Sequence, residues 1–66
     1  MTAKEMFEEL GYEAESDDEI IHYKNDLDNV MFYIDHEEYT NDVFYVDSKL
    51  HKAITQQMSE LGWLDD

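Results

Sequence analysis

The sequence predicts an α+β domain of two layers, with the order α-β-β-β-α and both helices on one face of a three-stranded antiparallel meander. Three observations support this fold class. A stripe of apolar residues at helical spacing opens the chain, a second stripe closes it, and the middle alternates short β-prone runs with polar turns. Sixty-six residues suffice for a single domain, so residues 1–66 are expected to fold as one unit.

The first helix is expected to begin at Thr2 and to end at Gly11. Thr2 and Glu5 stand three residues apart in a capping box, in which the threonine hydroxyl accepts from the third helical amide and the glutamate accepts from the threonine amide. Gly11 stands where a helix commonly ends in a left-handed residue. The apolar stripe that would face the sheet consists of Ala3, Met6, Phe7 and Leu10.

The middle of the chain is predicted to form a polar loop and then three short strands. The strand segments are rich in β-branched and aromatic residues, and the segments between them are rich in Asn and Asp. Short polar connections favour neighbouring antiparallel strands. The segments are a loop at residues 13–19, strands at 19–24 and 30–35 with a turn at 25–29 between them, and a third strand that begins within 36–42 and has its apolar part at 43–46.

A last helix is expected after Asp47 or Ser48, either of which can cap it, and Gly62 is expected to end it. Both helices close with the sequence Glu-Leu-Gly-aromatic. This ending fits a Schellman motif, in which the residue after the glycine contacts an apolar residue of the last turn. The apolar stripe of the last helix consists of Leu50, Ala53, Ile54, Met58 and Leu61.

The glutamates in these two endings are not explained by capping. Glu8, Glu9 and Glu60 stand in the last turns of their helices, where the helix macrodipole is negative. Each acid is therefore expected to cost a few tenths of a kcal/mol, roughly, and stability alone would favour lysine. We interpret these acids as a sign of function.

Alternation along the predicted strands separates an inward face from an outward face. No helix remains to cover the outward face, yet it carries tyrosine, methionine and valine where polar residues are usual. This face is either an ordinary exposed surface or a patch for self-association. The inward set is Val30, Phe32, Ile34, Phe44 and Val46, and the outward set is Met31, Tyr33, Val43 and Tyr45.

Charge is the outlying property of the composition. Eighteen acidic residues and four basic ones, all lysine, give a net charge of −14. Direct binding to nucleic acid or to an anionic membrane is disfavoured because both need a basic surface, whereas a basic protein is attracted. The acids either keep the chain soluble or imitate the phosphates of a nucleic acid. The acidic contact surface that we expect consists of Glu8, Glu9, Glu13, Glu15, Asp17, Asp18 and Glu19.

The sequence offers no motif for catalysis, a cofactor or a metal. It has no cysteine, its histidines fall in different predicted elements, and no serine stands in a nucleophile elbow. Asp26 and Asp28 resemble the start of a calcium loop, but Val30 and Met31 occupy positions that need an oxygen ligand and a glycine. We expect no enzymatic activity, no cofactor and no metal site. Without a signal peptide or a long apolar run, the expected location is the cytoplasm.

Several segments resemble a group of small uncharacterised proteins from phages and prophages of low-GC Gram-positive bacteria. They are the opening TAKEMFEELGY, the runs IIHY, VMFYID and VFYV, and the ending AITQQMSELGW. The resemblance covers nearly the whole chain and implies a phage accessory protein, but it implies no site residues. In charge and mixed α/β build, the chain is also similar to phage DNA mimics such as anti-CRISPR proteins, an analogy without a shared motif.

The sequence therefore predicts a non-enzymatic phage or prophage accessory protein that binds a basic or nucleic-acid-binding host protein through its acidic surface. The alternative is a small structural or assembly protein that forms a homodimer through the outward face of the sheet.

Overall fold

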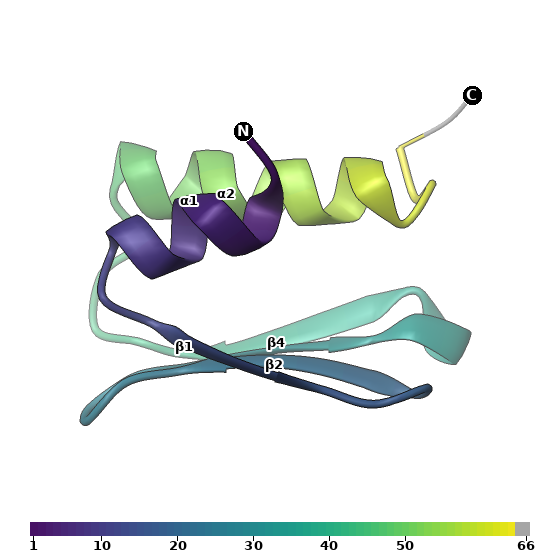
Figure 1. Ribbon diagram of the computed structural model, residues 1–66, viewed down its shortest axis with the longest axis horizontal. Coiled ribbons are helices and arrows are strands. Elements are labelled where there is room, and N and C mark those ends of the chain that lie inside the picture. Colours follow the sequence, from purple (N-terminus) through teal and green to yellow (C-terminus); the bar gives the residue numbers. More distant parts are fainter. Residues whose placement is uncertain (65–66) are drawn as a thin grey trace.

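A computed structural model describes residues 1–64 and shows two helices over one face of a four-stranded sheet (Figure 1). The predicted α+β class, with two layers and both helices on one side, is confirmed, but the predicted number of strands is wrong. The elements are α1 (Ala3–Glu9), β1 (Glu13–Ser16), β2 (Ile20–Lys24), β3 (Asn29–Tyr33), the 3-10 turn η1 (Ile34–His36), β4 (Glu38–Asp42) and α2 (Ser48–Glu60).

The sheet is an antiparallel meander with the strand order β1-β2-β3-β4. The loop that the sequence suggested at residues 13–19 contains an edge strand, β1, followed by a turn. Ala14 pairs with Tyr23 and packs against the core, while Glu13 and Glu15 are exposed. The strand was missed because its own residues have little β propensity and only one of them is apolar, so pairing with β2 decides its structure.

The last strand is also placed differently from the prediction. β4 consists of the polar residues Glu38–Asp42, and the apolar residues 43–46 lie in the connection to α2. Asp42 pairs with Asn29, the first residue of β3, so β3 offers no partner to the residues that follow Asp42. Phe44 and Val46, expected inside, are therefore 88% and 45% exposed.

Ile34 is a further correction, because it leaves the predicted strand and begins the turn η1, where it is half-buried. η1 and Glu37 connect β3 to β4. Glu37 has φ 51 and is the one non-glycine residue with positive φ among the described residues. This turn includes Ile34 and Asp35, which were predicted to belong to a strand. Because the turn ends at Glu37, Glu38 is the residue of β4 that pairs with Tyr33.

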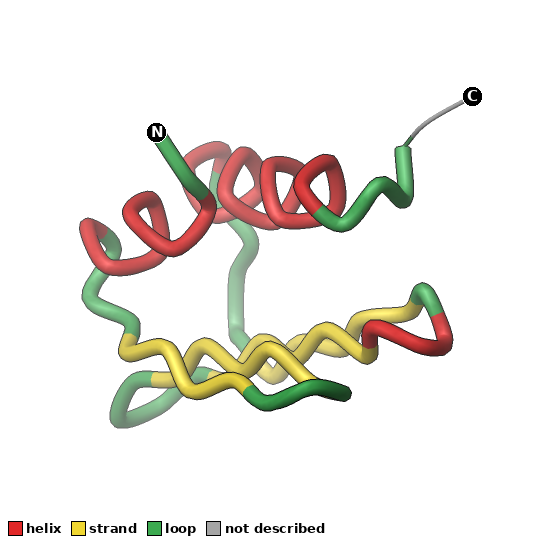
Figure 2. The backbone as a smooth tube through the Cα atoms, turned by 45° about the vertical axis from the view of Figure 1, so that its right-hand side comes forward, coloured by secondary structure: helices red, strands yellow, loops and turns green. Residues whose placement is uncertain are grey.

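The core lies between the helices and the two central strands. Phe7 of α1 is fully buried and stacks on Tyr23 of β2, with ring centroids 3.9 Å apart. Phe32 of β3 meets both rings edge-on. Each buried side chain of this size contributes roughly 1.5–3 kcal/mol through burial. Figure 2 shows that α1 and α2 lie on one side of the sheet, so no element within residues 1–64 covers the opposite face.

The predicted helix ends are confirmed. Thr2 and Glu5 form the capping box, and the Asp47 carboxylate caps α2 by accepting from the Leu50 amide. Gly11 and Gly62 have φ of 92 and 78, in the left-handed region. The amides one residue beyond them donate to the carbonyls five residues back, at 3.0 and 2.9 Å, which completes two Schellman motifs.

Neither helix of the described residues is long and apolar enough to cross a membrane.

Candidate functional site

The seven acids expected to form one contact surface occupy three separate places. Glu8 and Glu9 lie in the last turn of α1, and Glu13 begins β1 close to that helix end. Glu15 lies on the outer face of β1. Asp17, Asp18 and Glu19 form the turn between β1 and β2, at the opposite end of the sheet (Figure 1). The acids therefore do not make a single continuous row.

Glu15 has a partner within the sheet. Its Oε1 lies 2.8 Å from Nζ of Lys24 on the neighbouring strand. This hydrogen bond and the lysine charge lower the pKa of the Glu15 carboxyl and raise the pKa of Lys24. The pair is largely exposed, so water screens it and it contributes little to stability. A partner protein would have to compete with Lys24 for this carboxylate.

Asp17 shapes the turn that carries its neighbours. Its Oδ1 accepts hydrogen bonds from the amides of Glu19 and Ile20, both at 2.8 Å. These two backbone bonds lower the pKa of Asp17, which keeps the carboxylate charged. Asp17 thus holds the turn in place, while Asp18 and Glu19 remain exposed.

A second acidic segment lies beside this turn. The Ile34 amide donates to the Glu19 carbonyl at 2.9 Å, directly after the last pair of β2 and β3, Ile20 with Tyr33. The bond brings the turn η1 and the start of β4 next to the turn of β1 and β2. We call the six exposed acids of these two turns and of the first residue of β4 the acidic end; they are Asp17, Asp18, Glu19, Asp35, Glu37 and Glu38.

The acidic end contains no lysine. The one basic residue between its acids is His36, whose Nδ1 lies 3.7 Å from Oε1 of Glu38 on an exposed surface. The backbone of Glu37 is in the left-handed region, which costs roughly 1 kcal/mol for a residue with a Cβ. Asparagine or glycine would occupy this position at lower cost, so the turn retains an acid where its geometry favours another residue.

The outer face of the sheet adjoins the acidic end. Met31 and Tyr33 lie on this face of β3, as predicted, and the Tyr33 hydroxyl donates weakly to the Met31 sulfur at 3.7 Å. Ile20 and His22 lie beside them on β2. All four side chains are half-buried. The apolar members border the acidic end directly, because Ile20 and Tyr33 form the pair closest to it.

The other two members of the predicted association patch lie elsewhere. Val43 follows the end of β4 and packs against the core, and Tyr45 lies in the connection to α2, where it is 87% exposed. The prediction that Met31, Tyr33, Val43 and Tyr45 share one sheet face is wrong, because β4 ends at Asp42 before either residue.

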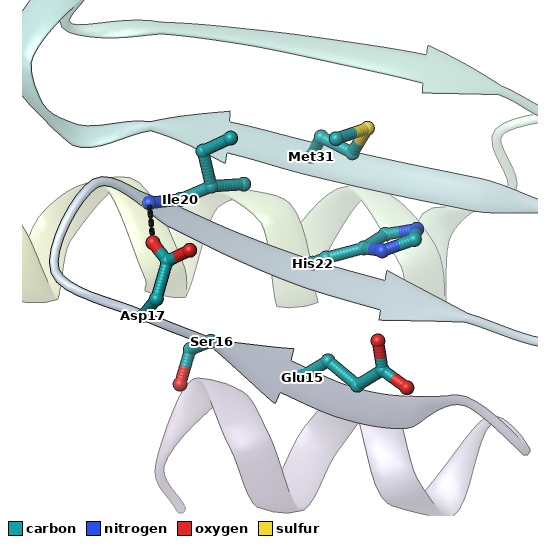
Figure 3. A pocket seen from close by; sticks show the side chains of 6 residues that line it. All are labelled: Glu15, Ser16, Asp17, Ile20, His22 and Met31. Atoms are coloured by element: carbon teal, nitrogen blue, oxygen red, sulfur yellow. Dashed lines mark hydrogen bonds between the residues drawn. The ribbon is translucent and has the colours of Figure 1, made fainter.

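A shallow hollow on the outer face joins the apolar and acidic groups. Its lining contains Ile20 and Met31 with Glu15 and Asp17 at the side. Figure 3 shows Glu15, Ile20 and Met31 on the strands β1, β2 and β3, and Asp17 in the turn after β1. His22 also lines it, and its Nε2 lies 2.8 Å from Oδ1 of Asn29, which orients the ring. An apolar floor with an acidic rim suits a protein contact better than a small ligand, because the hollow is open.

Metal-ligating groups do not gather in the described residues, 1–64. No group of three or more His, Asp or Glu side chains is arranged there to hold a metal ion. The three histidines lie apart on β2, η1 and α2.

The sequence contains a signal for the acidic end, although the predicted acidic surface does not include Asp35, Glu37 and Glu38. Glu19 and Ile34 stand at nearly equal distances from the turn cluster around residue 27, so a β2–β3 hairpin must bring residues 17–19 and 35–38 to one end. The hairpin thus places Asp35, Glu37 and Glu38 beside Asp17, Asp18 and Glu19.

The chain matches no protein-family model, no curated protein and no solved structure. The resemblance to phage and prophage proteins stays a prediction.

Proposed function

We propose that this chain is a non-enzymatic protein-binding module that engages a basic partner, of the kind that binds nucleic acid, through the acidic end. The observation that carries the proposal is the hydrogen bond from the Ile34 amide to the Glu19 carbonyl. It joins two acidic turns into one lysine-free group of six carboxylates, which is a target for lysine and arginine side chains that otherwise contact phosphates.

The charge of the acidic end raises the rate of association with a basic partner and the specificity for it more than the affinity. Opposite charges steer two proteins together and raise the association rate, and the effect falls as salt screens it. Each exposed ion pair contributes only roughly 0.2–1 kcal/mol. Useful affinity therefore needs several pairs acting together, and the six carboxylates of the acidic end can supply them.

The neighbouring apolar side chains supply the second component of an interface. Protein interfaces combine an apolar centre with a polar or charged rim. Ile20 and Tyr33 border the acidic end, and no element of the described chain covers them. A basic partner with an apolar side chain among its lysines or arginines would fit this surface.

An accessory role in a phage or prophage remains part of the proposal. It rests on the resemblance of the two helix endings and the strand segments, and on the acidic composition. In such a role the partner is a host protein whose nucleic-acid-binding face is occupied by the acidic end.

The test compares two variants of equal net charge. The first changes five acids of the acidic end to amides, and the second changes five exposed acids outside it, so both go from −14 to −9. Asp17 is left intact because it holds its turn. The acidic-end variant carries D18N, E19Q, D35N, E37Q and E38Q, and the control carries E8Q, E9Q, E13Q, D26N and D42N.

Each variant and the wild type serve as bait in a nuclease-treated host-cell lysate at low salt, followed by mass spectrometry of the captured proteins. The proposal expects a basic, nucleic-acid-binding protein that the wild type and the control retain, that the acidic-end variant loses, and that duplex DNA displaces. Equal retention by the two variants would show that net charge alone attracts the partner, and the proposal would then be wrong.

A further inference from the structure

The connection between β4 and α2 exposes large apolar side chains. Phe44 is 88% exposed and Tyr45 is 87% exposed, more than any other aromatic residue of the described chain. Val46 is 45% exposed, and Leu27, in the turn between β2 and β3, is 78% exposed. Single exposed apolar residues are ordinary, but neighbouring ones of this size mark an interaction site. We call these four residues the aromatic corner.

Both parts of the aromatic corner lie at one end of the sheet. Lys24 pairs with Asn29 and Asn29 with Asp42, so the turn after β2 and the connection after β4 leave the sheet at the same end. A small hollow lined by Asn25, Asp28 and Tyr45 joins the two segments. This end is opposite to the acidic end, as the course of the chain in Figure 1 shows.

The connection is held at both of its ends and open in the middle. Val43 packs against the core at one end, and the Asp47 cap of α2 fixes the other. Within the described residues, no backbone hydrogen bond engages residues 43–46. Phe44 and Tyr45 are thus presented on a short tethered segment, and their exposed side chains can contact another molecule.

The charged residues around the aromatic corner favour a second copy of this chain as its partner. Three of the four lysines of the chain lie toward this end: Lys24 ends β2, and Lys49 and Lys52 lie in the first half of α2. Acids lie there as well, among them Asp26 and Asp42. A surface with both signs of charge can face its own copy, whereas the lysine-free acidic end would repel one.

The exposed area supplies more than half of what a contact with a second copy needs. A buried aromatic side chain covers roughly 150–250 Å², so the aromatic corner offers roughly 500 Å² per copy. A standard interface buries about 800 Å² on each side, and the backbone and charged groups around the corner can supply the rest. A two-fold arrangement places the same patch on both sides of the contact.

We infer that two copies of this chain form a two-fold dimer through the aromatic corner, with Phe44 and Tyr45 of each copy packed on the other. The acidic ends then point away from the contact, at the two far sides of the dimer. Because each copy carries a net charge of −14, added salt screens the repulsion between copies and strengthens the dimer. Binding of a basic partner responds to salt in the opposite way.

The experiment is sedimentation velocity on the full chain, at micromolar to millimolar concentrations and at low and high salt. The wild type is compared with F44S/Y45S and with M31S/Y33S on the outer sheet face. Phe44 and Tyr45 are so exposed that their replacement should leave the fold intact. Circular dichroism melts verify that each variant is folded.

We expect a wild-type dimer that tightens with salt, a dissociation constant at least about tenfold weaker for F44S/Y45S, as for the loss of central aromatic contacts, and little change for M31S/Y33S. A wild type that stays monomeric at every concentration and salt would overturn the inference. So would a dimer that persists in F44S/Y45S, or one that M31S/Y33S abolishes.

Discussion

The Glu60 carboxylate accepts a hydrogen bond from the Ala3 backbone amide at 2.7 Å and so joins the end of α2 to the start of α1. The two helices run in opposite directions (Figure 1), so the negative end of α2 lies beside the positive end of α1. Gln56 donates to the same carboxylate oxygen at 2.9 Å. Glu60 therefore has a structural role, which the interpretation of helix-end acids as functional did not anticipate.

This contact predicts a loss of stability in Glu60→Ala. The variant leaves an amide of the first turn of α1 without its acceptor, which should lower the free energy of unfolding by about 1 kcal/mol. Urea denaturation measures the effect. Ser59→Ala, a change at the neighbouring exposed position, is the control and should be nearly neutral. Equal stability of Glu60→Ala and the wild type would show that the contact contributes nothing.

Glu8 and Glu9 are expected to behave in the opposite way. They are exposed in the last turn of α1, where the macrodipole favours cations, so E8K/E9K should raise the melting temperature. Part of any gain comes from the lower net charge alone. D18K/E19K makes the same charge change away from a helix end, so its smaller gain isolates the dipole effect. If the melting temperatures of the two variants rise equally, the position of Glu8 and Glu9 at the helix end does not destabilise the protein.

Glu37→Gly should stabilise the protein. Glycine adopts the left-handed backbone of this turn without steric cost, although it loses more entropy on folding, so the net gain is up to about 1 kcal/mol. Asp35→Gly in the same turn is the matched control. Asp35 does not have a positive φ, so glycine there should only destabilise. A destabilised Glu37→Gly in chemical denaturation would contradict the assigned strain.

The raised pKa of the Tyr23 hydroxyl predicts that the protein loses stability at alkaline pH. Burial, with smaller contributions from the charges of Glu60 and Glu8, raises the pKa of its hydroxyl from 10.0 to about 12. Because the folded state favours the neutral hydroxyl, this stabilisation is complete below pH 10 and is lost as the pH rises toward 12. The hydroxyl donates to the buried side chain of Gln57, so ionisation also removes a hydrogen bond donor.

Urea denaturation at a series of alkaline pH values tests this expectation. Tyr23→Phe should be less stable than the wild type at neutral pH, because Gln57 loses its partner, but its stability should fall less above pH 10. Tyr45→Phe, at an exposed position, should follow the wild type. Parallel curves for Tyr23→Phe and the wild type would mean that another group controls alkaline unfolding.

The parts of the fold that the sequence predicts well depend on residues close together in the chain. The capping box of Thr2 and Glu5, the Asp47 cap and the glycine endings each involve residues three to five positions apart, and all are present. Local hydrogen-bond chemistry decides these features, so a single sequence contains the information.

The strands were predicted less well because pairing decides them. Glu13–Ser16 has weak β propensity yet forms an edge strand on β2, whereas residues 43–46 have strong β propensity and form none. Residues 43–46 form no strand because β3 begins at Asn29, which already pairs with Asp42. The acidic end was missed for the same reason, since it forms only when the hairpin brings two distant segments together.

The central claim is that the acidic end is the surface that contacts a basic partner. Titration of the isotope-labelled chain with the captured partner, followed by amide chemical shifts in NMR spectra, tests it most directly. The account predicts that the largest shifts fall on residues 17–20 and 33–38. Shifts that centre instead on Glu8, Glu9 and Glu13, or that spread evenly over the whole surface, would contradict it.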